Sequence, residues 1–129
     1  MTPLSVARQA FAFYLVGDKA GVLALTDPHA TWTFPGDPSV VPWAGTFHGA
    51  GIARFMDLLV DHLDYEEARV ESVTAAGDRV FVQAYERYVV RATGRVCHNR
   101  LAGAFTVRDG RILAYEEYSD TAAMERASA

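Results

Sequence analysis

The apolar residues in the first half of the chain recur at helical spacing. Between Pro3 and Val16 they return every three or four residues, which is the period of one face of an α-helix. Asp18 follows at a position suited to the N-cap of a short second helix, and Ile52 to Leu63 carries one continuous apolar stripe. The pattern therefore predicts three helices, the first two of which meet at a tight Gly-Asp corner.

Strand-like segments occupy most of the remaining chain. A short strand at Thr31 to Phe34 precedes the third helix, and four longer strands follow that helix as a β-meander with a glycine at each corner. The four long strands are predicted at Tyr65–Thr74, Arg79–Ala92, Arg95–Val107 and Arg111–Ser119. The order ααβαββββ indicates an α+β domain over residues 1–129, in which helices bury one face of a single antiparallel sheet.

The predicted strand Arg79–Ala92 carries aromatic residues on both faces. Tyr88 lies on the same face as Glu86, whereas Phe81 and Tyr85 lie on the other face. The face of a sheet that contacts water normally carries polar side chains rather than aromatic ones. We therefore expect the Phe81 and Tyr85 face to form the interface of a homodimer.

Turn lengths predict which polar residues meet on the inner face. A two-residue turn at Thr93-Gly94 would place Glu86 opposite Leu101, and a three-residue loop before the last strand would place Leu101 opposite Glu117. Asn99 then lies diagonal to both glutamates. The backbones of the two glutamates would be roughly 10 Å apart, and a concave face would bring their carboxyl groups closer.

Two carboxyl groups and an amide in apolar surroundings suit acid–base chemistry, because burial separates the pKa values of the two acids. We therefore expect Glu117 to be the leading general acid or base, with Glu86 as its partner. Asn99 would donate to an oxyanion or a hydroxyl group. The residues expected to line the substrate pocket are Phe11, Tyr14, Trp32, Phe34, Leu59, Leu63, Tyr88, Leu101 and Tyr115.

Simpler interpretations of the same residues stay open. Glu86 could pair with Arg87 or Arg100 at a sheet edge, and the last strand could be solvated. A two-residue Asp-Gly turn would bring Glu116 inward in place of Glu117, since a slip of one residue exchanges the faces of a strand.

Composition and spacing exclude several classes of function. The chain has 12 Lys and Arg against 16 Asp and Glu, for a net charge of -4, and no basic cluster, so a nucleic-acid partner is not expected. The four histidines show no metal-ligand spacing, and we expect neither a metal nor another cofactor. No stretch approaches the roughly 18 apolar residues of a membrane span, and no signal peptide is recognisable, so we expect a cytoplasmic protein.

Several segments resemble the SnoaL-like branch of the nuclear transport factor 2-like superfamily. They are Trp32–Gly36, Gly45–Gly49, the helix up to Phe55, and Asp109–Ile112 through Glu117–Thr121. The resemblance implies a cone-shaped fold, whose curved antiparallel sheet wraps a pocket closed by helices. The superfamily includes polyketide cyclases, ketosteroid isomerases, limonene epoxide hydrolases, dehydratases and non-catalytic binders.

The chain departs from the better-known enzymes of this superfamily at the positions that would carry their chemistry. The general-base Asp of ketosteroid isomerases falls at Phe34, and their oxyanion-hole acid falls at Asn99. The two carboxylates of the epoxide hydrolases match Glu86 and Glu117, whereas the Arg that bridges them falls at Ala84. Their water-holding Tyr and Asn fall at Trp32 and Phe34. Cyclases use few fixed residues, so a cyclase activity is the one that these departures contradict least.

The resemblance and the polar face together predict an enzyme that transfers protons without a cofactor. It would act as an isomerase, cyclase, dehydratase or hydrolase on a small apolar or aromatic metabolite. Two alternatives are a protein that binds such a metabolite without turnover and a scaffold dimer with a vestigial pocket.

Overall fold

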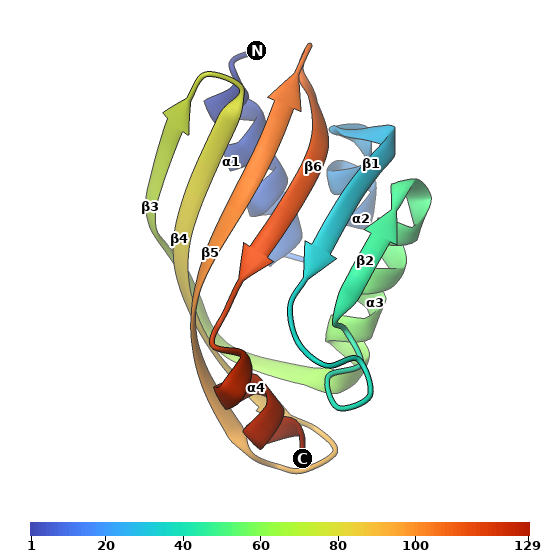
Figure 1. Cartoon of the computed structure of the whole chain (residues 1–129), viewed down its shortest axis with the longest axis vertical. Helices are drawn as coiled ribbons and strands as arrows, with labels where there is room; N and C mark the ends of the chain where they lie inside the picture. Colours follow the sequence, from blue (N-terminus) through green and yellow to red (C-terminus); the bar gives the residue numbers. More distant parts are fainter.

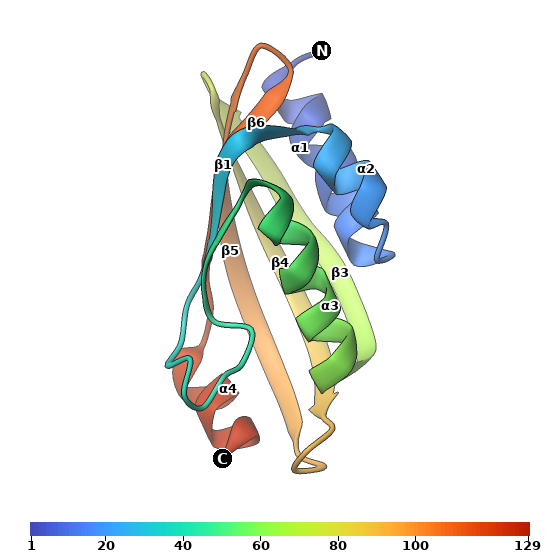
Figure 2. The same cartoon turned by 90° about the vertical axis from the view of Figure 1, so that its right-hand side faces the viewer.

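A computed structural model describes the whole chain, residues 1–129. Six strands form one curved sheet in the order β2-β1-β6-β5-β4-β3, and three helices cover its concave face (Figures 1 and 2). The helices are α1 (Pro3–Leu15), α2 (Lys19–Ala24), α3 (Ile52–His62) and α4 (Thr121–Ser128). The strands are β1 (Thr26–Phe34), β2 (Gly45–His48), β3 (Leu63–Ala76), β4 (Arg79–Val90), β5 (Val96–Arg108) and β6 (Arg111–Tyr118).

Side-chain caps fix the starts of the first two helices, as the sequence predicts. Thr2 Oγ1 accepts a hydrogen bond from the Ser5 N–H at 3.1 Å, and Pro3 occupies the first turn of α1. Asp18 Oδ1 accepts from the Gly21 N–H at 2.9 Å and caps α2. Together, α1 and α2 form a helical hairpin along one side of the sheet (Figure 2).

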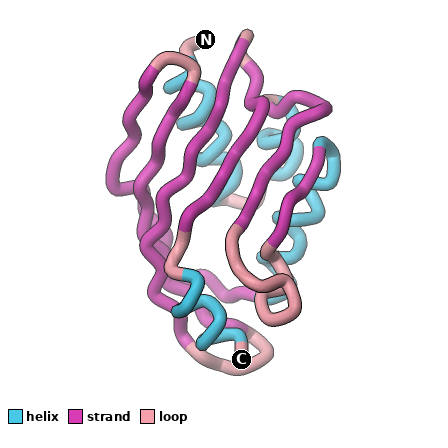
Figure 3. Tube along the Cα trace, in the orientation of Figure 1, coloured by secondary structure: helices cyan, strands magenta, loops and turns pink.

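The structure adds the strand β2, the 3-10 helix Gly49–Gly51 and the helix α4 to the predicted order, and it changes one strand pairing. The short strand β2 pairs with β1, and α4 follows the sheet at the C-terminal end of the chain (Figure 3). Asp120 Oδ1 caps α4 by accepting from Ala123 N–H at 3.0 Å. The prediction of a wholly antiparallel sheet is corrected at one place, because β1 pairs with β6 in parallel.

The predicted register between β4 and β5 is wrong by two residues. Glu86 pairs with Asn99, and Leu101 pairs with Ala84. The cause is the corner, where Val90 N–H bonds to Arg95 O at 2.9 Å and a four-residue loop replaces the two-residue turn. A shift of two residues preserves the face on which each side chain lies, so Glu86 and Asn99 remain on the inner face.

The register between β5 and β6 also differs from the predicted one, because a shorter turn and a β-bulge replace the three-residue loop. The corner is a two-residue turn at Asp109-Gly110 with φ of 51° and 75°, as in a type I′ hairpin. That turn alone would direct Glu116 inward. However, Thr106 pairs with Ala114 while Val107 pairs with Ile112, so a β-bulge at Leu113 takes up one residue. The bulge restores the alternation, and Glu117 pairs with Gly103 on the inner face.

Aromatic side chains fill the space between α1, α3 and the β1–β6 half of the sheet. Phe34 stacks on Phe55 with ring centroids 3.5 Å apart, and Trp32 lies 4.9 Å from Tyr115. Phe105 packs at the edge of Trp32 with a centroid distance of 6.1 Å. This part of the inner face is therefore solid core, which leaves the β3–β4 half as the place for a cavity. No helix in the structure has both the length and the apolarity needed to span a membrane.

Candidate active site

Two buried polar side chains form a direct pair on the inner face of the sheet. Glu86 on β4 is 8% exposed and Asn99 on β5 is 1% exposed. Because they are cross-strand partners, the Asn99 Nδ2 group reaches Glu86 Oε1 and donates to it at 3.0 Å. A buried carboxyl group is held here by an amide rather than by a positive charge.

Further hydrogen bonds connect this pair to the second glutamate. Asn99 Nδ2 also donates to Ser119 Oγ at 3.2 Å, and Ser119 Oγ donates to Glu117 Oε2 at 3.2 Å. Tyr115 Oη donates to the other oxygen, Glu117 Oε1, at 3.1 Å. The two carboxyl groups are thus linked through Asn99 and Ser119 in one continuous network.

The backbone fixes the orientation of the Asn99 amide. Its Oδ1 accepts from the Asp120 N–H at 3.1 Å, which requires the NH₂ group to face Glu86 and Ser119. Both amide hydrogens are therefore engaged within the protein. The structure brings together the three residues predicted from the sequence, but leaves Asn99 without a free N–H for a ligand.

Burial sets the acidity of both glutamates. Loss of water contact raises the pKa of Glu86 to about 7, with the hydrogen bond from Asn99 acting in the opposite direction. Burial raises the pKa of Glu117 to about 8, and the nearby negative charge of Glu86 adds to this shift. Hydrogen bonds from Tyr115 and Ser119 lower the pKa of Glu117 in part. Near neutral pH the two acids therefore share protons as a coupled pair.

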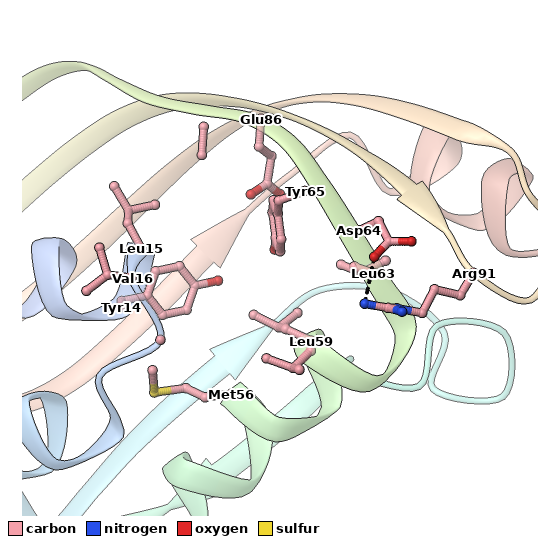
Figure 4. Close-up of a pocket in the computed structure, with 13 residues that line it drawn as sticks. Tyr14, Leu15, Val16, Met56, Leu59, Leu63, Asp64, Tyr65, Glu86 and Arg91 are labelled. Carbon is pink, nitrogen blue, oxygen red and sulfur yellow. Dashed lines mark ion pairs between the residues drawn. The ribbon is translucent and has the colours of Figure 1, made fainter.

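A cavity of about 350 Å³ opens beside Glu86 between α1, α3 and β3 (Figure 4). Its lining is mostly apolar, and Glu86 projects into it from the sheet. Arg91 Nη2 lies 2.6 Å from Asp64 Oδ1, so the positive charge at the rim is paired. The lining residues are Tyr14, Leu15, Val16, Gly17, Met56, Leu59, Val60, Leu63, Asp64, Tyr65, Ala68, Glu86 and Arg91.

Two phenols contribute polar groups to the cavity. Burial raises the pKa of Tyr14 well above its usual value, with the charge of Glu117 next in size, and a hydrogen bond from Tyr65 acts against the shift. Burial followed by the charge of Glu86 raises the pKa of Tyr65 in the same way. Both phenols stay protonated at neutral pH, and the Tyr14 hydroxyl points toward Tyr65 (Figure 4). Tyr14 therefore supplies an O–H donor beside Glu86.

Three of the nine predicted pocket residues, Tyr14, Leu59 and Leu63, line the cavity. The other six lie in the adjoining core instead: Phe11, Trp32, Phe34, Tyr88, Leu101 and Tyr115. Sequence reasoning missed Tyr65, which pairs with Tyr88 across β3 and β4 at a ring-centroid distance of 5.6 Å. Assigning the β3–β4 register would have placed it on the inner face.

The remaining titratable side chains do not assemble a second centre of this kind. His98 lies on the outer face, where its Nδ1 and Tyr85 Oη are 2.8 Å apart. Cys97 is a buried free thiol whose pKa is raised, mainly by burial. No group of three or more His, Cys, Asp or Glu side chains is arranged to hold a metal ion.

Comparisons with known proteins agree with this architecture. The family model described as a SnoaL-like domain matches residues 7–115. An NTF2-like protein from Burkholderia xenovorans is 28% identical with a TM-score of 0.86, over 98% of this chain and 95% of that chain. An NTF2-like protein from Burkholderia thailandensis is 27% identical with a TM-score of 0.87, over 98% and 97%. TerC, co-crystallised with polyporic acid, is 23% identical with a TM-score of 0.81, over 98% of both chains. No curated protein matches the chain.

Proposed function

Because the chain belongs to the family of SnoaL-like domains, we propose that it is a cofactor-independent enzyme that transfers protons on a small, largely apolar organic molecule. One observation carries the proposal. Glu86 reaches the cavity with a pKa raised to about 7, and a hydrogen-bonded network links it to a second acid, the half-buried Glu117. The TerC structure with polyporic acid is a further example of this fold in the presence of a small organic molecule.

The geometry favours Glu86 as the group that exchanges a proton with the ligand, because it lines the cavity and Glu117 does not. This assignment reverses the order of the two acids expected from the sequence. A general acid or base works best when its pKa lies near the working pH, and burial brings Glu86 there. Glu117 would hold the second proton of the pair, and isomerisation, cyclisation, dehydration or hydrolysis would all use such a pair.

Asn99 and Tyr14 would divide the roles that the sequence assigned to Asn99 alone. Both N–H groups of Asn99 are engaged, so we propose that it positions Glu86 and couples it to Ser119. Tyr14 lines the cavity with a protonated hydroxyl and would donate to an oxygen on the ligand. That hydrogen bond would stabilise negative charge that develops as a proton leaves carbon.

Incorporation of solvent deuterium tests the proposal without a known substrate. A panel of cyclic ketones and enones is incubated with the protein in D₂O and followed by mass spectrometry. We expect exchange that increases with pH through about 7, as Glu86 ionises. Glu86→Gln should lower the rate by about 10²-fold or more, whereas the exposed Glu116→Gln should not change it.

Two results would count against proton transfer. Every glutamate could titrate near about 4.3 by carbon-detected NMR, or the protein could bind members of the panel without exchanging their protons. The second result would indicate a ligand-binding protein without turnover.

The outer face of the sheet supports the homodimer expected from the sequence. Phe81 is 44% exposed there and Tyr118 is 59% exposed, while small residues such as Ala102 lie between them. We propose that two copies pair through this face. Sedimentation should show a dimer at micromolar concentration that Phe81→Asp converts to a monomer, and a wild-type monomer under those conditions would contradict the pairing. The cytoplasmic location stays a prediction.

A further inference from the structure

We infer that the ligand of the cavity beside Glu86 carries a basic nitrogen and binds as an ammonium ion against the Glu86 carboxyl group. The inference rests on the proposed function in one respect only, which is that it places the ligand in the same cavity. It adds the charge of the ligand, which the proposed function leaves open.

The Glu86 carboxyl group has one oxygen available to a ligand. Its Oε1 accepts from Asn99 at 3.0 Å, whereas its Oε2 makes no hydrogen bond within the protein. More than nine-tenths of the residue is buried, and its carboxyl group points into the cavity (Figure 4). Oε2 is therefore the acceptor that a hydrogen-bond donor on a ligand in the cavity would meet.

The lining of the cavity contains no unpaired positive charge. Arg91 is the only basic residue in the lining, and it is paired with Asp64. Helix α3 contributes only apolar side chains to the cavity, namely Met56, Leu59 and Val60. The titratable groups around Glu86 and its neighbours are Tyr14, Asp64, Tyr65, Tyr88, Arg91, Cys97, Tyr115, Glu117, Asp120 and Arg126. Except for Arg91 and Arg126, all of them are neutral or acidic, and Arg126 lies on α4 outside the lining of the cavity.

This charge distribution discriminates between ligands. An anion would force both Glu86 and Glu117 into their protonated forms and would find no positive partner in a site of low polarity. A cation would gain a charge-assisted hydrogen bond to Glu86 Oε2 and attraction to the electron-rich rings of Tyr14 and Tyr65. The apolar lining would hold the hydrocarbon part of the ligand. The site therefore suits a hydrophobic amine.

Binding of an ammonium ion has a distinct pH signature. The cation favours the ionised form of the acid pair, so it releases a proton on binding when the pair is protonated in the free protein. Its affinity should therefore increase by up to about tenfold per pH unit between pH 6 and the range where the pair is ionised. A neutral ligand of the same shape should show little change over this range.

Three probes that share one hydrocarbon part and differ in charge test the inference. They are 4-tert-butylbenzylamine, which is a cation below pH 8, the neutral 4-tert-butylbenzyl alcohol, and the anion 4-tert-butylbenzoate. Their affinities are measured by calorimetry at pH 6, 7 and 8. We expect the amine to bind at least about tenfold more tightly than the alcohol at pH 8, the gain of one hydrogen bond to a charged group. The benzoate should bind most weakly.

Two variants assign the preference to Glu86. Glu86→Gln should abolish the advantage of the amine over the alcohol, and the alcohol should still bind because the apolar lining is intact. Glu116→Gln removes an exposed carboxylate from the other face of β6 and should preserve the advantage. Calorimetry in buffers of different ionisation enthalpy should show proton release with the amine alone.

The inference is overturned if the amine and the alcohol bind equally at pH 8, if the benzoate binds best, or if none of the probes binds. It is also overturned if the preference for the amine survives in Glu86→Gln. The two proposals can fail separately. Preference for the amine without deuterium exchange would contradict the proposed enzyme. Deuterium exchange without that preference would contradict only the positive charge assigned to the ligand.

Discussion

Glu116 and Glu117 are neighbours on β6, and each is hydrogen-bonded to a tyrosine two residues away in the chain. Glu116 accepts from Tyr118 on the outer face, where both side chains are exposed. Glu117 accepts from Tyr115 on the inner face, where burial and the charge of Glu86 raise its pKa to about 8. The same acid–phenol pair is therefore a solvated surface pair on one face and part of a proton-sharing network on the other. What surrounds the pair decides its chemistry, more than the residues in it.

The largest contrast between the faces is expected from two phenylalanines. Phe105 is 0% exposed on the inner face, so Phe105→Ala should lower the free energy of unfolding by about 3–5 kcal/mol. Phe81→Ala on the outer face should lower the stability of the subunit by less than about 1 kcal/mol and should mainly weaken self-association. Urea denaturation of both variants measures the difference, and equal losses would show that the outer face is packed as tightly as the inner one.

The second contrast is a dependence of stability on pH that comes from the inner face. A buried acid with a raised pKa binds its proton more tightly in the folded protein than in the unfolded chain. The contribution of these two acids to stability is therefore greatest below about pH 4.3 to 5 and is lost as pH rises through 7 and 8, where Glu86 and Glu117 ionise. For Glu86 alone the decline should be about 3–4 kcal/mol, at about 1.4 kcal/mol per pKa unit.

Glu86→Gln should flatten this decline, and the variant should be more stable than the wild type at pH 8.5. Glu116→Gln should retain the full decline because it changes only the exposed face. Thermal unfolding from pH 5 to 8.5 compares the three proteins. Identical pH profiles for all three would mean that the inner carboxyl groups are solvated.

Small enlargements of a side chain on each face give a smaller contrast. A Cβ at Gly103 would lie 2.3 Å from Tyr115 Oη, so Gly103→Ala should displace the phenol and lower stability by about 1–3 kcal/mol. The displaced phenol should also lose its hydrogen bond to Glu117, which would raise the pKa of Glu117 further. Ala102→Val on the exposed face should change stability by less than about 0.5 kcal/mol. Chemical denaturation and carbon-detected NMR check both effects.

The smallest contrast is between the two tyrosine hydroxyls. Tyr115→Phe removes a donor from a carboxyl group with few other partners and should lower stability by about 1 kcal/mol at pH 8.5. Tyr118→Phe removes a hydrogen bond on the outer face and should change the stability of the subunit by less than about 0.5 kcal/mol. Equal effects of the two substitutions would contradict the contrast drawn between the faces.

Local sequence signals predicted three of the four α-helices and placed Glu86, Asn99 and Glu117 on the inner face. Thr2, Asp18 and the glycine corners are recognisable because capping and positive φ depend on single residues. The strand β2 was missed because its four residues form a strand only by pairing with β1. Likewise α4 has only two buried residues, Met124 and Ala127, too few to give a clear period.

The sequence placed the polar residues on the correct face but not in the correct register. The four-residue loop after Val90 shifts Glu86 by two positions, and a shift of two leaves the face unchanged. The cavity was placed less well, because its position depends on where bulky side chains fill the interior. Phe34 and Phe55 stack and close the β1 side, which leaves space beside Tyr65 and Glu86 instead. Periodicity contains no information on such volumes.

The β-bulge at Leu113 decides which side chains of β6 face the interior. The residues after the bulge alternate between the two faces of the sheet, and the bulge sets the alternation in which Tyr115 and Glu117 point inward. Deletion of Leu113 would exchange the two faces of the strand and turn Glu116 and Tyr118 toward the interior. Each face of β6 carries one glutamate and one tyrosine. A change of one residue in the length of the strand would therefore replace the inward carboxyl group with its neighbour and would not remove it.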